Sequence, residues 1–178
     1  SLRGGVFRKI VGGKEVSTAN SSIMNIIIIK MAHNPSRVYY KDSYEEGKRV
    51  SPICWSNNSK KPDVEVRKPQ SKSCHTCPNS VRGSGFGGVG TSCRLSWRVA
   101  IVLANDPEGD VLELVLPSNS CFGKEEKGKW PFKTYVQMLA DNNVSAGRIV
   151  TKMQFDPNSV KPRALFSPVE AVEDWVLD

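Results

Sequence analysis

The chain has 178 residues, of which 39% are hydrophobic and 24% are charged, so its composition favours a folded protein over a disordered one. This length suits one compact domain with its own core and is short for two. The longest apolar run, around residues 26–29, is far shorter than a membrane span, and no signal-peptide pattern is present. We therefore expect neither membrane insertion nor secretion.

The net charge of +7 is unevenly distributed along the chain. Residues 1–105 hold 17 Lys and Arg against 6 Asp and Glu, whereas residues 106–178 hold 8 against 12. A basic first part with an acidic end predicts a polyanion-binding surface and a tail that competes for it. Aromatic residues lie among the basic ones, which favours a nucleic acid as the polyanion. A basic protein without such a ligand is the alternative.

The first part of the chain shows strand patterns followed by a long irregular stretch. "VFRKIVGGKEV" alternates around Gly12 and Gly13, as in a hairpin with a two-residue turn. Residues 23–31, "IMNIIIIKM", predict a central strand, and residues 36–44, "SRVYYKDSY", a strand end or exposed loop. Residues 45–96 are rich in Pro, Ser, Gly and Lys and lack periodicity. Something other than a hydrophobic core must organise a loop of that length.

Regular patterns return after residue 96. "WRVAIVLAN" and "DVLELVLP" predict two strands joined by the turn "DPEGD". In "WPFKTYVQMLADNN" apolar residues recur at helical spacing from Phe132 to Leu139, after Pro131 at a tolerated first-turn position. "GRIVTKMQFD" and "PRALFSPVEAV" predict two more strands. About six or seven strands and one helix favour a mainly β protein, a small barrel with a long insertion.

Five cysteines are present, and four of them lie in or beside the irregular stretch. Cys74 and Cys77 form a C-x2-C knuckle, the spacing at which two thiolates bind one metal ion from a tight turn. Cys54 and Cys93 flank the knuckle and would complete a tetrahedral, structural zinc site. Such a site would stabilise the insertion by roughly 10 kcal/mol or more. We expect Cys121 to be a small core residue.

Other uses of the cysteines are less favoured. A thioredoxin-like pair needs a helix after the knuckle, but Pro78 and a glycine run follow it. Structural disulfides need an oxidising compartment and an even number of cysteines, and an iron–sulfur cluster would use the same ligands as zinc. His75 could replace Cys54 as a ligand. The glycine loop "GSGFGGVG" lacks the Gly-Lys-Ser/Thr of a phosphate-binding loop, so we expect a flexible tip that contacts a polymer.

Three stretches carry a family resemblance over nearly the whole chain: "CWSNNSKKPDVEVRKPQSKSCHTCPNSVRGSG", "CRLSWRVAIVLANDPEGDVLELVLPSNSCFG" and "IVTKMQFDPNSVKPRALFSPV". Together they resemble the single-stranded-DNA-binding proteins of tailed bacteriophages, which have an OB-fold and a structural zinc in an insertion. The knuckle is the most specific part. Cys54, Cys74, Cys77 and Cys93 match the recurrent cysteines of the family, and Cys121 departs from its pattern.

The resemblance implies one OB-fold-like domain over residues 1–178, a five-stranded barrel with one helix and a zinc-binding insertion at residues 45–96. It implies a non-catalytic protein that coats single-stranded DNA during phage replication or recombination in the host cytoplasm. Residues 170–178, "EAVEDWVLD", are a candidate acidic tail for docking the phage DNA polymerase or other replisome proteins. No membrane association is implied.

Binding single strands without sequence preference needs cations for the phosphates and flat side chains for the bases. The predicted DNA contacts are of these two kinds: Arg8, Lys9, Arg37, Tyr39, Tyr40, Lys41, Trp55, Arg82, Phe86, Arg94, Trp97 and Arg98. One of Tyr39 and Tyr40 is expected in the core, and Trp97 is as well suited to filling a barrel as to stacking on a base.

Two other function classes stay open. A zinc-stabilised nuclease would need clustered carboxylates and histidines, but the chain has only two histidines, His33 and His75, and the carboxylates of Asp106, Glu108 and Asp110 lie in a turn. A duplex-binding regulator would need a recognition-helix pair, for which no pattern is visible.

Overall fold

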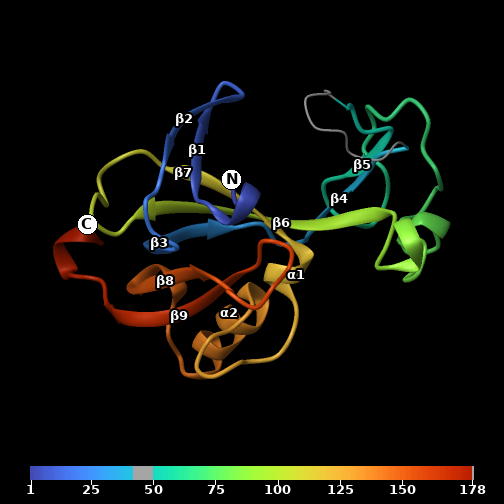
Figure 1. The fold of residues 1–178 in the computed structure, drawn as a ribbon. Coiled ribbons are helices and arrows are strands. Elements are labelled where there is room, and N and C mark those ends of the chain that lie inside the picture. The colour runs from blue at the N-terminus through green and yellow to red at the C-terminus, as the bar shows by residue number, and fades with distance from the viewer. Residues whose placement is uncertain (42–49, 178) are drawn as a thin grey trace. The chain divides into compact units, whose positions relative to one another are not determined.

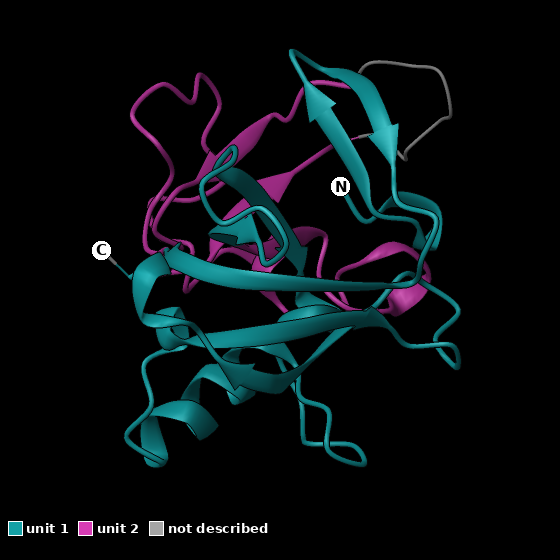
Figure 2. Ribbon diagram, turned by 90° about the vertical axis from the view of Figure 1, so that its left-hand side faces the viewer, with its two compact units in different colours: residues 1–31, 98–178 teal, residues 32–97 magenta. Residues whose placement is uncertain are grey.

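The computed structural model describes residues 1–41 and 50–177, which form a mainly β protein (Figure 1). The chain divides into two compact units: residues 1–31 with 98–178 form unit 1, and residues 32–97 form unit 2 (Figure 2). The predicted insertion at residues 45–96 falls in unit 2, apart from residues 45–49, which lie outside the described residues. No helix of the described chain is long and apolar enough to cross a bilayer.

Unit 1 is built on an antiparallel sheet whose central strand is the predicted isoleucine-rich one. β3 (Ile23–Met31) pairs with β6 (Cys93–Leu103) on one side and with β8 (Ile149–Phe155) on the other. β9 (Ala164–Ala171) continues the sheet beyond β8, and β7 (Leu112–Pro117) pairs with β6. Ile26, Ile27 and Ile28 are at most 3% exposed. Because consecutive strand residues point to opposite faces, both faces of β3 are covered here.

A separate hairpin precedes this sheet, as predicted. β1 (Arg8–Val11) and β2 (Lys14–Thr18) pair antiparallel, with Val11 opposite Lys14. The two turn residues, Gly12 and Gly13, have φ angles of 58° and 81°. A two-residue turn with positive φ at both positions matches the right-handed twist of the strands, which explains the paired glycines.

The predicted helix is α2 (Phe132–Asp141), which follows Pro131 and ends at Asn142. Its apolar positions pack into the core of unit 1: Phe132 is 1% exposed and Tyr135 is fully buried. The ring of Phe166, from β9, lies 5.4 Å from that of Phe132 and 6.1 Å from that of Tyr135. The helix therefore covers the sheet through an aromatic cluster. A one-turn helix, α1 (Ser118–Cys121), precedes it.

The Tyr135 hydroxyl predicts an alkaline limit to the stability of unit 1. It lies 2.8 Å from the Thr151 hydroxyl, and both residues are fully buried. Burial raises the pKa of Tyr135 above its ordinary value of 10.0, and the hydrogen bond to Thr151 offsets part of this rise. The unfolded chain ionises first as pH increases, so stability should fall above about pH 10.

We expect Tyr135→Phe to cost about 1–3 kcal/mol of unfolding free energy at pH 7, because the Thr151 hydroxyl loses its partner. The variant should also lose less stability between pH 9 and pH 11 than the wild type. Urea unfolding across this pH range measures both effects. The matched control is Tyr40→Phe, whose ring is 39% exposed and which should change neither quantity. Equal stability of Tyr135→Phe and wild type would contradict the prediction.

The predicted five-stranded barrel is not closed in the described residues; the strands form open antiparallel sheets. β9 would have to pair with a further strand to close unit 1. Its outer edge at Phe166 is instead occupied by Trp130, which exchanges two backbone hydrogen bonds of 2.8 Å with it. The segment that leads into α2 thus takes the place of a closing strand.

Unit 2 contains a small sheet and long connecting loops. β4 (Ser36–Tyr39) lies between β5 (Cys54–Ser56) and the first residues of β6, and both pairings are antiparallel. Of the stretch predicted as a strand end or exposed loop, residues 36–39 form the middle strand of this small sheet, and residues 42–44 lie outside the described residues. Elsewhere in residues 32–41 and 50–97, the regular elements are two single 3-10 turns, at Pro78–Ser80 and Phe86–Gly88.

Candidate metal centre and nucleic-acid interface

Strand pairing in unit 2 brings two of the predicted ligands to one face of its sheet. Tyr39 of β4 lies directly opposite Cys54 of β5 and opposite Cys93 of β6. Side chains of directly opposed residues point to the same face, so both thiols share the face of Tyr39. Cys74 and Cys77 come from the loop, where the Cys77 amide donates to the Cys74 carbonyl at 3.3 Å and closes the knuckle.

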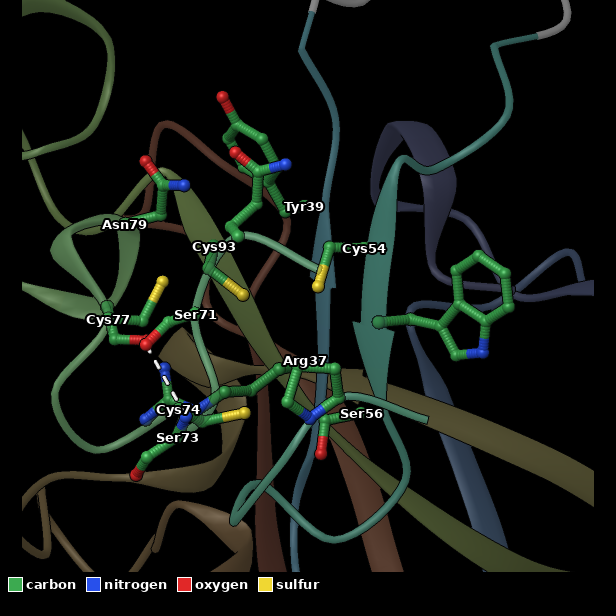
Figure 3. Close-up of a pocket in the computed structure, with 14 residues that line it drawn as sticks. Arg37, Tyr39, Cys54, Ser56, Ser71, Ser73, Cys74, Cys77, Asn79 and Cys93 are labelled. Carbon is green, nitrogen blue, oxygen red and sulfur yellow. Dashed lines mark hydrogen bonds between the residues drawn. The ribbon is translucent and has the colours of Figure 1, made fainter. Parts of the chain in front are cut away.

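The four predicted ligands line one pocket, shown in Figure 3. Three of them are buried, with exposed fractions of 7% for Cys74, 7% for Cys77 and 8% for Cys93. The enclosed space is about 20 Å³, enough for one water-sized occupant. His75 is exposed and does not line the pocket, which argues against it as a substitute for Cys54. All five cysteines of the chain are free thiols.

Burial in the pocket disfavours the thiolate form of Cys93. Burial raises the pKa of the Cys93 thiol to about 11, the Arg37 guanidinium lowers it by less, and the other three cysteines raise it further. In residues 1–41 and 50–177, no group of three or more His, Cys, Asp or Glu side chains lies close enough together to hold a metal ion. A thiol can move toward one by rotation about its Cα–Cβ bond, and metal binding deprotonates it.

Unpartnered polar atoms indicate what the pocket can hold. Across the described chain, three buried side-chain polar atoms have no hydrogen-bond partner: Arg37 Nε, Arg37 Nη1 and Ser80 Oγ. Both residues line this pocket, and no carboxylate does. Buried donors need acceptors, and four metal-bound thiolates would supply them with a net charge of −2. The residues present therefore fit a four-thiolate zinc centre.

The fifth cysteine has the predicted packing role. Cys121 lies in unit 1 and is fully buried, and its thiol donates to the Leu116 carbonyl at 3.6 Å. It belongs to α1 and is not among the residues that line the pocket of unit 2.

The predicted DNA contacts in unit 1 are mostly engaged within the protein. Arg8 Nη1 lies 2.8 Å from the Glu15 carboxylate, and Lys9 Nζ lies 3.0 Å from that of Asp110. A cation with such a partner gains less from a phosphate, because it must first give up the carboxylate. Arg98, on β6, is exposed.

The sheet of unit 2 carries a second face that combines a flat ring with a cation. Val38 of β4 lies opposite Trp55 of β5 and opposite Arg94 of β6. Since neighbouring strand positions alternate, these residues point away from the face of Tyr39 and the cysteines. Arg94 is exposed and Trp55 is half-buried, so both can reach a ligand on this face.

Other predicted contacts divide into exposed and buried groups. Phe86, in the glycine loop, is 94% exposed, and Tyr40 is 39% exposed. Lys41 and Arg82 are exposed as well. By contrast, Trp97 is only 8% exposed and donates its ring N–H to the Ala32 carbonyl at 2.9 Å. Its ring is a packing element, one of the two roles that its sequence position left open.

Unit 2 concentrates the positive charge of the chain. Residues 32–97 contain 11 Lys and Arg against 5 Asp and Glu, so they hold six of the seven net positive charges. In the described parts of this unit, residues 32–41 and 50–97, no Lys or Arg forms an ion pair. Apart from Arg37, the Lys and Arg residues in these described parts are exposed, so an external polyanion can reach them.

Sequence reasoning missed two features of this site. It predicted Arg37 as a DNA contact and did not anticipate that the pairing of β4 places this residue on the face of the cysteines. It did not consider Ser80, although its position three residues after Cys77 was a usable signal.

In comparisons with known proteins, no family model matches this chain, and no curated protein and no solved structure shows a significant similarity to it.

Proposed function

We propose that the protein binds single-stranded DNA without sequence preference and without catalysis, through unit 2, which a zinc ion bound by four cysteines holds together. The observation that carries this proposal is the contrast between the two units. The cations of unit 1 that were predicted to bind DNA are largely ion-paired, whereas the cations in the described parts of unit 2 have no ion pair and lie among exposed rings.

The expected binding mechanism has two parts. Lysines and arginines of unit 2 would neutralise phosphates and release the counterions condensed on the strand. Trp55, Phe86 and Tyr40 offer rings on which any base can stack, each contributing roughly 1–3 kcal/mol. Both contacts ignore base identity, which suits a protein that must cover any sequence.

Zinc, when bound, would cross-link three segments of unit 2 through thiolate bonds. Cys54 and Cys93 would hold adjacent strand ends, and the Cys74–Cys77 knuckle would tie the loop to them. The protein's own residues would keep the ion enclosed and away from water. A closed set of four thiolates leaves no open position for a substrate, so the role is structural.

By the same proposal, the protein coats exposed strands in phage replication or recombination inside the host cell. An OB-type sheet presents single strands on its face, and an open sheet can do so as well as a closed barrel. The acidic end, residues 170–178, is proposed to dock a polymerase or another replisome protein; of these, Asp178 lies outside the described residues.

A tryptophan-fluorescence titration with oligo(dT), repeated with duplex DNA of equal length and at rising salt, tests the function. We expect quenching with a strong preference for the single strand, because stacking needs accessible bases. The logarithm of affinity should fall linearly with the logarithm of salt, by about 0.7 per phosphate neutralised. Equal affinity for duplex, or no binding at low salt, would contradict the proposal.

Single-residue variants separate the two kinds of contact. Phe86→Ala should weaken oligo(dT) binding by roughly 1–3 kcal/mol and leave the salt slope unchanged. Arg94→Gln should lower the salt slope by about 0.7. Lys161→Gln is the matched control, because Lys161 is an exposed cation of unit 1, and it should change neither quantity.

A further inference from the structure

Arg37 occupies a position from which it can reach both ligand-bearing strands of unit 2. It lies on the central strand β4, directly opposite Ser56 of β5 and Leu95 of β6. Cys54 lies two residues before Ser56, and Cys93 lies two residues before Leu95, so both cysteines are on the same face of the sheet as Arg37. Such diagonal neighbours have Cα atoms about 7–8 Å apart, a span that a long side chain covers. Figure 3 shows Arg37 in the space that the thiols surround.

The guanidinium of Arg37 has two N–H groups that no hydrogen bond engages. Its Nε and Nη1 atoms are buried without a hydrogen-bond partner. No Asp or Glu lines the pocket, whose other ionisable groups are the four cysteines and Tyr39. Arg37 is half-buried, and each buried N–H group left without an acceptor destabilises the fold. Within the pocket, the thiolates can both accept these hydrogen bonds and balance the positive charge.

Ser80 presents a third donor to the same space. It ends the 3-10 turn Pro78–Ser80, directly after the knuckle, and its amide donates to the Cys77 carbonyl at 3.0 Å. Its hydroxyl is buried without a hydrogen-bond partner and lines the pocket. A hydroxyl group can donate one hydrogen bond to a thiolate sulfur.

We infer that Arg37 and Ser80 are positioning residues of the metal centre: they donate N–H···S and O–H···S hydrogen bonds to its thiolates, and Arg37 offsets part of its negative charge. This inference rests on the proposed four-cysteine zinc site and is independent of DNA binding. Four thiolates with Zn²⁺ carry a charge of −2, and the guanidinium reduces it to −1 within the pocket. The arrangement also removes Arg37 from the set of phosphate contacts.

Metal retention by variants of the full-length protein tests the inference. The zinc-loaded protein is mixed with a chromogenic chelator at pH 7, and the rate of zinc transfer and the zinc content are measured. We expect Arg37→Met to lose zinc about 10- to 100-fold faster than wild type, as for other residues that support metal ligands. Arg37→Lys should release zinc at a rate between those of wild type and Arg37→Met, because its ammonium group keeps the positive charge but lacks the planar set of N–H donors of a guanidinium. Ser80→Ala should show a smaller increase.

Arg94→Met is the matched control, because it removes a cation from the adjacent strand on the opposite face and should release zinc at the wild-type rate. Cobalt-loaded variants should keep the charge-transfer bands of a tetrahedral four-thiolate site, which shows that the ligand set is intact. If Arg37→Met does not fold, the zinc-release rate of Arg37→Lys tests the inference instead. Release from Arg37→Lys at the wild-type rate would then overturn it.

The outcomes separate this inference from the proposed function. Wild-type protein that binds zinc, together with Arg37→Met that releases it at the wild-type rate, overturns the role of Arg37 alone. Wild-type protein that binds no zinc overturns the metal site and this inference together. Loss of oligo(dT) affinity in Arg37→Met equal to that in Arg94→Met, with unchanged zinc release, would return Arg37 to the phosphate contacts.

Discussion

Cys77→Ser is expected to abolish zinc binding and to unfold residues 54–93 while unit 1 stays folded. Structural zinc contributes about 10–16 kcal/mol in small metal-dependent domains. Unit 2 has little else to replace it: its buried hydrophobic residues in the described chain are Val66, Cys74, Cys77, Cys93 and Trp97. Three of these five are proposed ligands, so losing the metal also removes the reason for their burial.

Limited proteolysis with mass spectrometry, combined with a zinc assay, measures this result. Cleavage should appear within residues 54–93 in the variant and should be absent there in zinc-loaded wild type. Cys121→Ala is the control, because it removes a buried thiol from unit 1 and should leave one zinc per chain and a resistant unit 2. Undiminished protease resistance of residues 54–93 in Cys77→Ser would refute the metal site.

Phe166→Ala is expected to cost unit 1 about 3–5 kcal/mol of unfolding free energy, a large share of the 5–15 kcal/mol typical of a domain. Phe166 is fully buried, and its ring contacts both Phe132 and Tyr135. The truncation therefore leaves a cavity where the helix meets the sheet. Because the backbone hydrogen bonds to Trp130 do not depend on the side chain, the edge pairing should survive.

Urea unfolding followed by circular dichroism gives the free-energy change. Phe86→Ala is the matched control: it makes the same truncation at a ring that is 94% exposed and should stay within about 0.5 kcal/mol of wild type. The pair also separates stability from binding, because Phe86→Ala is expected to weaken oligo(dT) binding. A loss below 1 kcal/mol in Phe166→Ala would show that the aromatic cluster is not the main contact of α2.

The elements that sequence reasoning predicted well are those specified by neighbouring residues. Gly12 and Gly13 supply the positive φ angles of their turn, and the run of isoleucines around residue 27 has no stable place except a covered strand. The apolar spacing from Phe132 to Leu139 likewise specifies one helix face. Each pattern lies within a dozen residues, so its physical cause can be read locally.

The errors and omissions concern contacts between distant residues. The predicted barrel is not closed in the described residues, and the edge of β9 at Phe166 pairs instead with Trp130, 36 positions away. Nothing in "WPFK" marks that pairing. The four cysteines could be selected by spacing, but the face on which Arg37 lies depends on which residues of β5 and β6 oppose β4. Alternation in "SRVYY" gives two faces and does not say which one is turned to the thiols.

The pairing of Trp130 with β9 affects how the sheet edge behaves when many copies of the protein lie close together. An uncovered outer strand offers a row of free backbone groups to which a strand of a second molecule can add, and such additions propagate into aggregates. At Phe166 these groups are already paired within the chain. Under the proposed function, molecules bound along one DNA strand would lie side by side at very high local concentration. The pairing of Trp130 with Phe166 would then limit strand addition between neighbouring molecules at this edge.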